Sequence, residues 1–241
     1  MQNTTIHGIW KFMIYIPVFI VGLLIGIYLL ISRALGITTV YGLENFPTLK
    51  QIEENGLEVV SNHLSLLEPL LLIGLFFQWY IFRPKYGPWN IAEISNYRRK
   101  AFRLMEPRLI LVNRHDPRST SRALLRACNI LKSGSIVIVF PEGGRTFKFS
   151  PDNVLVGRDG KKIGRFKNGA AFLATHTQAL VMPIWVNGTD KVAPNKEVAR
   201  YPFLRLWRRV NITIGPSMRF KKDMSAEEVT LVLEKVVLDL A

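Results

Sequence analysis

Hydrophobic positions along this chain fall into one long run near the start and a series of short runs after it. The long run, Phe12–Ser32, is 21 residues without a charge. As a helix it would span about 30 Å, the thickness of the hydrocarbon core of a bilayer. Pro17 lies inside the run and could kink the helix or divide it into two shorter pieces in one leaflet. The pattern therefore predicts an N-terminal membrane-associated helix or helical hairpin over residues 1–36.

The pattern favours two other readings of this run less. It is too long for the core of a signal peptide, and no small-residue cleavage site follows it. It could also be a buried helix of a soluble protein, although its length and terminal position favour the membrane. Gly22 and Gly26 lie four residues apart within it, a spacing that can form a helix-pairing face.

The rest of the chain, residues 37–241, alternates short apolar runs with helical patterns and contains no internal repeat or second domain. Such alternation is typical of an α/β fold, and we expect a mixed, largely parallel central sheet flanked by helices. The Gly-, Lys- and Arg-rich stretch Gly143–Gly169 is predicted to be a long loop. The predicted strands are Thr38–Tyr41, Leu57–Val60, Trp79–Phe82, Leu109–Asn113, Ser135–Phe140, Ala179–Val186 and Val210–Gly215. The predicted helices are Leu66–Phe77, Ile94–Met105, Pro117–Lys132, Asn168–Thr177 and Ala226–Asp239, the last with a Ser225–Glu228 capping box.

The charge balance is strongly basic and indicates a polyanionic partner. The chain has 32 Lys and Arg against 18 Asp and Glu, a net charge of +14, and mean hydropathy is +0.17. Between Arg83 and Arg126 eleven Lys and Arg face three acidic residues, and Tyr201–Arg209 interleaves aromatic with basic side chains. Beside a membrane segment this composition favours a membrane with anionic lipids, and nucleic acid is the less favoured partner. The basic residues that follow the apolar run favour a cytoplasmic main domain.

The cysteine and histidine content argues against metal chemistry. Cys128 is the only cysteine, which excludes an internal disulfide and suits a reducing compartment. The four histidines have no Cys or His neighbours at zinc-ligand spacing. We therefore expect no metal site.

One strand-to-helix junction carries the strongest chemical signal. His63 follows the strand Leu57–Val60, and Glu68 lies five residues later at the start of an apolar helix. A carboxylate beside an imidazole fixes its tautomer and lets it accept a proton from a hydroxyl. The two side chains can meet only if His63 lies in the turn before the helix. Ser65 and Glu68 also fit a helix capping box, and one glutamate could serve both purposes.

Three further stretches end strands or open helices with cationic groups. Arg114 follows the strand Leu109–Asn113, where an anionic ligand could meet it, or where it could form an ordinary surface ion pair. Phe140–Thr146 turns sharply around Glu142 and Gly143 and projects Arg145, which could also be a charged turn with no ligand. Lys167 precedes the start of the helix Asn168–Thr177, a place suited to an anion or to a simple N-cap.

Taken together, these stretches resemble the glycerolipid acyltransferase family, and its lysophosphatidate acyltransferase branch in particular. The family's signature has blocks in a fixed order, together with a Phe-Lys-x-Gly-Ala motif. The matching segments here are Asn62–Glu68, Leu109–Arg114, Phe140–Thr146, Phe166–Ala170 and Val181–Ile184. Tyr41–Pro47 is similar to the family's entry strand, so the likeness extends from about Thr39 to Gly188. One position departs from the pattern, because Glu68 stands where the family usually has Asp.

The resemblance implies transfer of an acyl group from a thioester, either acyl-CoA or acyl-carrier protein, to the hydroxyl of a lysophospholipid, most simply 1-acylglycerol 3-phosphate. It assigns His63 as general base and Glu68 as its partner. It places Arg114 and Arg145 on the acceptor phosphate with help from Lys167, and Glu142 and Gly143 in the substrate-binding loop beside them. No metal or prosthetic group is implied. Another lysolipid acceptor, or a catalytically silent membrane-binding protein, are the alternatives.

Overall fold

A seven-stranded sheet forms the centre of the molecule, and its strands run mostly in one direction. The computed structural model describes residues 3–95, 106–157, 159–194 and 204–241. The strand order is β1-β9-β8-β2-β5-β3-β4, and all neighbouring pairs are parallel except β8 with β9. The strands are β1 (Thr38–Tyr41), β2 (Leu57–Ser61), β3 (Trp89–Glu93), β4 (Leu109–Val112), β5 (Ile136–Val139), β8 (Leu180–Asn187) and β9 (Val210–Ile214). The prediction of a mixed, largely parallel sheet is confirmed.

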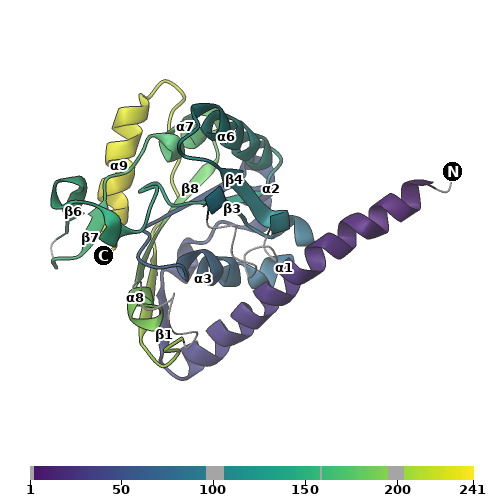
Figure 1. Ribbon diagram of the computed structural model, residues 1–241, viewed down its shortest axis with the longest axis horizontal. Helices are drawn as coiled ribbons and strands as arrows, with labels where there is room; N and C mark the ends of the chain where they lie inside the picture. Colours follow the sequence, from purple (N-terminus) through teal and green to yellow (C-terminus); the bar gives the residue numbers. More distant parts are fainter. Residues whose placement is uncertain (1–2, 96–105, 158, 195–203) are drawn as a thin grey trace.

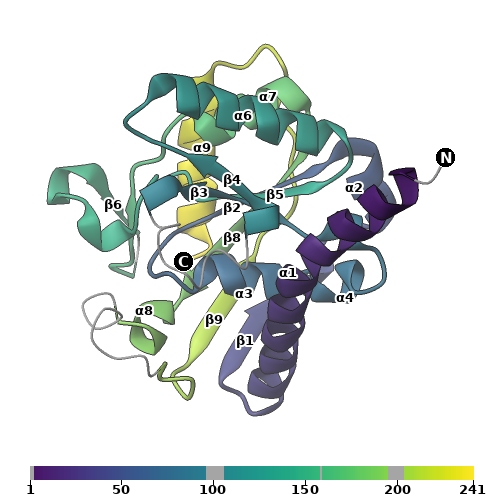
Figure 2. The same ribbon diagram turned by 45° about the vertical axis from the view of Figure 1, so that its right-hand side comes forward.

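Helices cover both faces of this sheet and bury it between two apolar layers (Figures 1 and 2). One layer packs beneath α1, α3 and α4, and the other beneath α6, α7 and α9. Because β2 is central, all five of its residues are buried, which explains its continuous apolar run. The helices are α1 (Asn3–Ala34), α2 (Leu49–Asn55), α3 (Glu68–Leu75), α4 (Phe77–Tyr80), α6 (Pro117–Lys132), α7 (Gly169–Thr177), α8 (Thr189–Val192) and α9 (Ala226–Asp239).

The N-terminal apolar run forms one continuous helix, so the alternative of a hairpin divided at Pro17 is wrong. Within α1, Ile16–Ala34 is long and apolar enough to cross a membrane. Figure 1 shows α1 lying along the domain at its C-terminal end and projecting away from it at its N-terminal end. A β-carbon added at Gly22 or Gly26 would collide with the rings of Tyr80 and Phe77 in α4. The two glycines therefore do form a helix-pairing face, and the partner is within this chain.

One predicted strand is wrong. Trp79–Phe82 spans the end of α4 and the turn after it, because Phe77 and Tyr80 pack their rings against α1 instead of pairing with a strand. The strand of the central sheet that the sequence analysis missed is β3, in which the polar residues Asn90 and Glu93 interrupt the apolar pattern. Tertiary packing outweighs the β-propensity of aromatic residues at this point.

The remaining elements agree with the predictions to different degrees. Helices α6 and α9 have the predicted bounds, and the Ser225–Glu228 capping box is present. The predicted long loop holds a small antiparallel pair, β6 (Val154–Val156) and β7 (Lys162–Gly164), which the prediction missed. Helix α2 was also missed, although Thr48 and Gln51 form its capping box. Most of the predicted helix Ile94–Met105 lies outside the described residues.

Candidate active site

The turn between β2 and α3 brings His63 and Glu68 into contact. His63 lies after the end of β2, and Glu68 is the first residue of α3. Nδ1 of His63 lies 3.1 Å from Oε2 of Glu68, and the glutamate side chain is fully buried while the imidazole is 14% exposed. A proton on Nδ1 would be donated to this carboxylate, which leaves Nε2 with its lone pair. This is the arrangement that a general base requires.

Glu68 is held by more than the histidine. Both of its oxygens accept from the backbone N–H of Ser65, at 2.9 Å, and Oε1 also accepts from the hydroxyl of Thr189. The hydroxyl of Ser65 accepts from the N–H of Leu67 at 3.0 Å, so the reciprocal capping box is only half formed. One carboxylate thus orders the turn and contacts the imidazole at the same time. Thr189 is the first residue of α8, and Gly188 separates it from the end of β8.

Asn62 joins this turn to the neighbouring strand. Its Nδ2 donates to the carbonyl of Val186 at 2.8 Å, and its Oδ1 accepts from the N–H of Val186 at 2.7 Å. The side chain is fully buried and pairs with β8 as a strand backbone would. This pair of hydrogen bonds fixes the position from which His63 starts.

Glu142 lies behind His63 and connects three segments. It accepts from the N–H of His63 at 2.6 Å, the hydroxyl of Thr146 at 2.6 Å and the N–H of Gly164 at 2.7 Å. The side chain is fully buried, and burial raises the pKa of Glu142 to about 7 against the opposing effect of these hydrogen bonds. Its oxygens therefore hold the His63 turn, the turn after β5 and strand β7 together.

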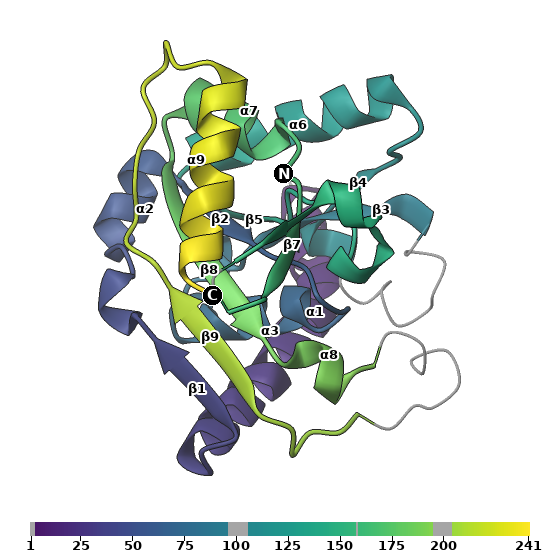
Figure 3. The ribbon, with the colours of Figure 1, turned by 90° about the vertical axis from the view of Figure 1, so that its left-hand side faces the viewer.

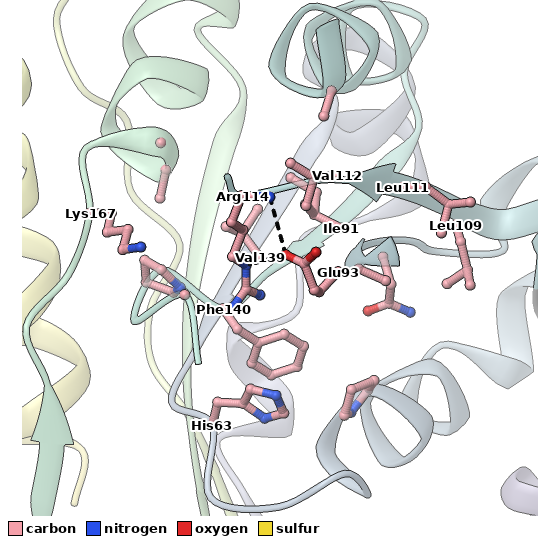
Figure 4. A pocket seen from close by; sticks show the side chains of 18 of the residues that line it. His63, Ile91, Glu93, Leu109, Leu111, Val112, Arg114, Val139, Phe140 and Lys167 are labelled. Atoms are coloured by element: carbon pink, nitrogen blue, oxygen red, sulfur yellow. Dashed lines mark hydrogen bonds and ion pairs between the residues drawn. The ribbon is translucent and has the colours of Figure 1, made fainter. Parts of the chain in front are cut away.

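A cavity of about 340 Å³ opens beside His63 at the ends of β3, β4 and β5. Figure 4 shows His63, Phe140, Arg114 and Lys167 converging at one part of it, with Leu109 and Leu111 at the end away from Lys167. Much of the remaining wall is apolar and comes from α3, α6 and α7. The site thus combines an imidazole, two cations and an apolar chamber.

The two cations are positioned by different means. Nε of Arg114 lies 3.2 Å from Oε2 of Glu93, so Arg114 forms an ion pair and also lines the cavity. The stem of Lys167 passes close over Gly143, where an added β-carbon would lie 3.0 Å from its Cε. Gly143 has a φ of 72°, so a side chain there would be strained as well as crowded.

Arg145 differs from the other predicted site residues. It lies on the turn after β5, but it does not line this cavity, and its guanidinium lies 5.0 Å from the ring centre of Phe147. Glu142 does not line the cavity either. The structure therefore gathers His63, Arg114, Gly143 and Lys167 around the cavity and places Glu68 and Glu142 behind it.

The sequence analysis missed two side chains that contact the catalytic candidates. Phe140 stacks on the imidazole of His63, with ring centres 4.6 Å apart, and Thr189 contacts Glu68. Phe140 was noted only as part of a motif, and nothing local connects Thr189 to a residue 121 positions earlier. No group of three or more His, Cys, Asp or Glu in the described segments could hold a metal ion.

Comparison with known proteins finds acyltransferases that are similar to most of this chain. The family model described as Acyltransferase matches residues 37–187. The chain is 34% identical over 157 residues to the chloroplastic 1-acyl-sn-glycerol-3-phosphate acyltransferase BAT2 of Brassica napus, covering 65% of this chain and 39% of that protein. It is 27% identical over 187 residues to a 1-acyl-sn-glycerol-3-phosphate acyltransferase of Pseudomonas aeruginosa, covering 74% of this chain and 58% of that protein.

A solved structure supports the fold over a longer range. The crystal structure of the 1-acyl-sn-glycerophosphate (LPA) acyltransferase PlsC from Thermotoga maritima superposes with a TM-score of 0.58 at 25% identity, covering 85% of this chain and 70% of that one. The chain spans well under two thirds of the length of the chloroplast relatives that it matches. The family model matches residues 37–187, more than half of the chain, and shows that this chain belongs to the acyltransferase family.

Proposed function

We propose that this protein transfers a fatty acyl group from a thioester to the free hydroxyl of a lysophospholipid, with 1-acylglycerol 3-phosphate as acceptor and phosphatidate as product. The observation that carries the proposal is the His63–Glu68 pair beside an apolar cavity that Arg114 and Lys167 also line. A base, an anion site and an apolar chamber are what this acceptor and an acyl donor need. The names of the relatives support the same reaction.

His63 acts as the general base in this scheme. Its Nε2 takes the proton from the acceptor hydroxyl while Nδ1–H stays hydrogen-bonded to Glu68, whose charge stabilises the imidazolium. The hydroxyl oxygen then bonds to the thioester carbonyl carbon, the carbon–sulfur bond breaks, and the departing thiolate receives the proton from His63. The reaction as written needs neither an enzyme nucleophile nor a metal or prosthetic group. The donor is acyl-CoA or acyl-carrier protein.

Arg114 and Lys167 bind the acceptor phosphate in this proposal. Both line the cavity, and a guanidinium and an ammonium at one site suit a phosphate. Phosphate would compete with Glu93 for Arg114, so binding exchanges one ion pair for another. Arg145, which the family resemblance also places on the phosphate, does not line the cavity and has the weaker support.

Membrane attachment belongs to the same proposal. Helix α1 is long and apolar enough to cross a membrane. The acceptor and the product of the proposed reaction are lipids that stay in the bilayer. The basic residues after α1 favour a cytoplasmic catalytic domain at a membrane that contains anionic lipids.

The test is acyl transfer by detergent-purified protein. Lysophosphatidate is offered with acyl-CoA and, separately, with acyl-carrier protein, beside His63→Ala as the inactive control. We expect phosphatidate from the unmutated protein alone. A folded protein that gives no product with either donor, and none with a panel of other lysolipids, would overturn the proposal.

The phosphate site has its own test. Arg114→Ala and Lys167→Ala are each expected to raise KM for lysophosphatidate roughly tenfold, as loss of a charged hydrogen bond does. Lys148→Ala, an exposed lysine on the neighbouring turn, is the matched control. An unchanged KM in both cavity variants would exclude the assigned phosphate contacts.

A further inference from the structure

Residues 204–209, Leu-Arg-Leu-Trp-Arg-Arg, form an exposed segment with both apolar and basic side chains, here called the tryptophan loop. Trp207 is 66% exposed, and Leu204 and Leu206 are exposed as well. Arg208 and Arg209 are also exposed, and the loop contains no acidic residue. A large exposed aromatic side chain among arginines has no role in the active site described above. Such a patch marks an interaction surface.

The tryptophan loop lies against the C-terminal end of α1. The hydroxyl of Tyr28 in α1 donates to the carbonyl of Leu206 at 3.4 Å, and Val210 donates to the carbonyl of Ile37 at 3.0 Å. Two residues near this end of α1, Leu30 and Leu35, are 65% and 67% exposed. Figures 1 and 3 show the start of β9 and the end of α1 together at the same end of the molecule. The exposed apolar face of α1 therefore continues into the loop.

Strand directions place this surface at the side of the sheet where β2 ends and where the active site lies. β9 is antiparallel to β8, with Asn211 beside Asn187, and β8 is parallel to β2, with Ile184 beside Ser61. β9 therefore begins beyond the end of β2, on the same side of the sheet, and His63 follows the end of β2. Since β9 is two strands from β2, these two strands lie about 10 Å apart across the sheet.

Gly188 fixes the loop to this side of the sheet. It follows β8 with a φ of 87°, and an added β-carbon would lie 2.3 Å from the carbonyl oxygen of Arg209. The next residue is Thr189, which contacts Glu68. The end of the tryptophan loop and a contact of the catalytic pair are thus adjacent in the structure.

We propose that the tryptophan loop, together with the C-terminal end of α1, docks on a bilayer that contains anionic lipid and holds the active-site edge against that bilayer. Tryptophan prefers the interface between headgroups and acyl chains, and arginines bind lipid phosphates. A single apolar helix leaves rotation about its own axis undetermined. Because α1 packs against α3 and α4, a second contact beside it fixes the orientation of the whole domain.

This docking rests on the proposed function and deepens it, because it explains how a membrane lipid reaches His63. The binding itself needs no catalysis. The positive charge of the loop complements anionic lipid, and the adjoining helix is long enough to enter a bilayer. A lipid surface is therefore favoured over a protein. The adjacent helix α8 exposes the acidic residue Asp190, and the exposed Lys191 beside it balances that charge.

The test measures depth in the bilayer. Full-length protein with Cys128→Ala carries a nitroxide label on Trp207→Cys and is bound to vesicles of phosphatidylglycerol and phosphatidylcholine. The control label is on Ser133→Cys, an exposed residue just before β5 begins, at the opposite edge of the sheet. We expect the label at 207 to collide with oxygen in the bilayer and the label at 133 to collide with a water-soluble nickel chelate. Equal access of the nickel chelate to both labels in vesicle-bound protein would overturn the proposal.

Two further measurements keep the test independent of labelling and of catalysis. Brominated lipids should quench the tryptophan fluorescence of the unmutated protein more than that of Trp207→Phe, and equal quenching would contradict docking. The double variant Leu206→Ser, Trp207→Ser should transfer to vesicle-bound lysolipid roughly tenfold less well, with unchanged transfer to a short-chain monomeric lysolipid. A full rate of transfer to vesicle-bound lysolipid by this double variant would contradict docking alone. A label at 207 that is buried in the bilayer, without any acyl transfer, would contradict only the proposed function.

Discussion

Glu68 makes contacts that explain how a glutamate can stand where the family usually has an aspartate. Its carboxylate reaches the imidazole of His63 at 3.1 Å although the side chain is one methylene longer. The same carboxylate also accepts from the N–H of Ser65 and the hydroxyl of Thr189. The buried carboxylate therefore has hydrogen-bond donors on both oxygens, which keeps it in one position.

Thr189 is predicted to position Glu68. Thr189→Val keeps the shape of the side chain but removes the hydroxyl donor, and we expect kcat to fall roughly tenfold with little change in KM, since one hydrogen bond to a charged group is lost. Thr189→Ser restores the donor and should recover most of the rate. If serine and valine at this position were equally impaired at equal thermal stability, the hydroxyl would have no such role.

Glu142 is predicted to support the site without touching the substrate. In Glu142→Gln an amide N–H₂ replaces one oxygen and must face a donor, from His63 on one side or Thr146 and Gly164 on the other. We expect a loss of about 1–3 kcal/mol of stability and a lower kcat. KM for lysophosphatidate should change little. A variant with normal stability and a raised KM would show that Glu142 binds substrate.

The sequence predicted these site residues unevenly. The motifs gave His63, Glu68, Arg114 and Lys167 because each stands next to a strand end or helix start, where local pattern is informative. Thr189 and the role of Glu142 depend on contacts between distant segments, and no local pattern records them.

Among the elements, α1 shows how small residues set a contact. Gly22 and Gly26 let α4 approach, and an added β-carbon at Gly74 in α3 would lie 2.6 Å from Ile25. Helices with patterns of their own were predicted well, as α6 and α9 show. Trp79–Phe82 was assigned to the wrong class because its aromatic residues favour a strand until the packing against α1 is known.

Gly26→Leu is predicted to push α1 away from α4. The leucine would overlap the ring of Phe77, and overpacking of this kind costs about 1–3 kcal/mol. Unfolding by heat in detergent should therefore begin at a lower temperature. Leu24→Phe, on the exposed face of the same helix, is the control and should leave the unfolding temperature unchanged. Equal effects of the two substitutions would contradict the packing of α1.

At the scale of the whole molecule, the sheet order could not be read from the sequence. β1 pairs with β9, which lies at the other end of the chain, and the antiparallel pairing of β8 with β9 breaks the regular alternation. The layered α/β class follows from local patterns, whereas these pairings follow from packing of the complete chain.

The stability of the molecule should fall as pH rises, because of Glu58. This carboxyl is fully buried on β2, neither oxygen has a hydrogen-bond partner among the described residues, and burial raises its pKa well above the ordinary value of 4.5. The free energy of unfolding has its full value below about pH 4.5, where Glu58 is protonated in both the folded and the unfolded chain. As the pH rises toward the higher folded pKa, this free energy falls by about 1.4 kcal/mol per pH unit. Urea unfolding at pH 5 and pH 8 measures this loss.

Glu58→Met should lower the pH slope and make the protein more stable at pH 8. Glu142, whose burial raises its pKa to about 7, keeps a slope of its own in this variant. Glu58→Gln should lower the slope by the same amount but keep the cost of a buried polar group. An unchanged slope in both variants would mean that other groups cause it.

The central claim is that His63 and Glu68 act together as the base, and the most direct measurement is the turnover of Glu68→Gln. Glutamine can still accept from the N–H of Ser65, but it cannot stabilise an imidazolium by charge. We predict a folded protein with a lower unfolding temperature, because the amide N–H₂ must face a donor from His63 or Thr189. We also predict a kcat lower by roughly a thousandfold or more, as in other carboxylate–histidine pairs. A kcat within a few fold of the unmutated protein would contradict the catalytic role of this pair.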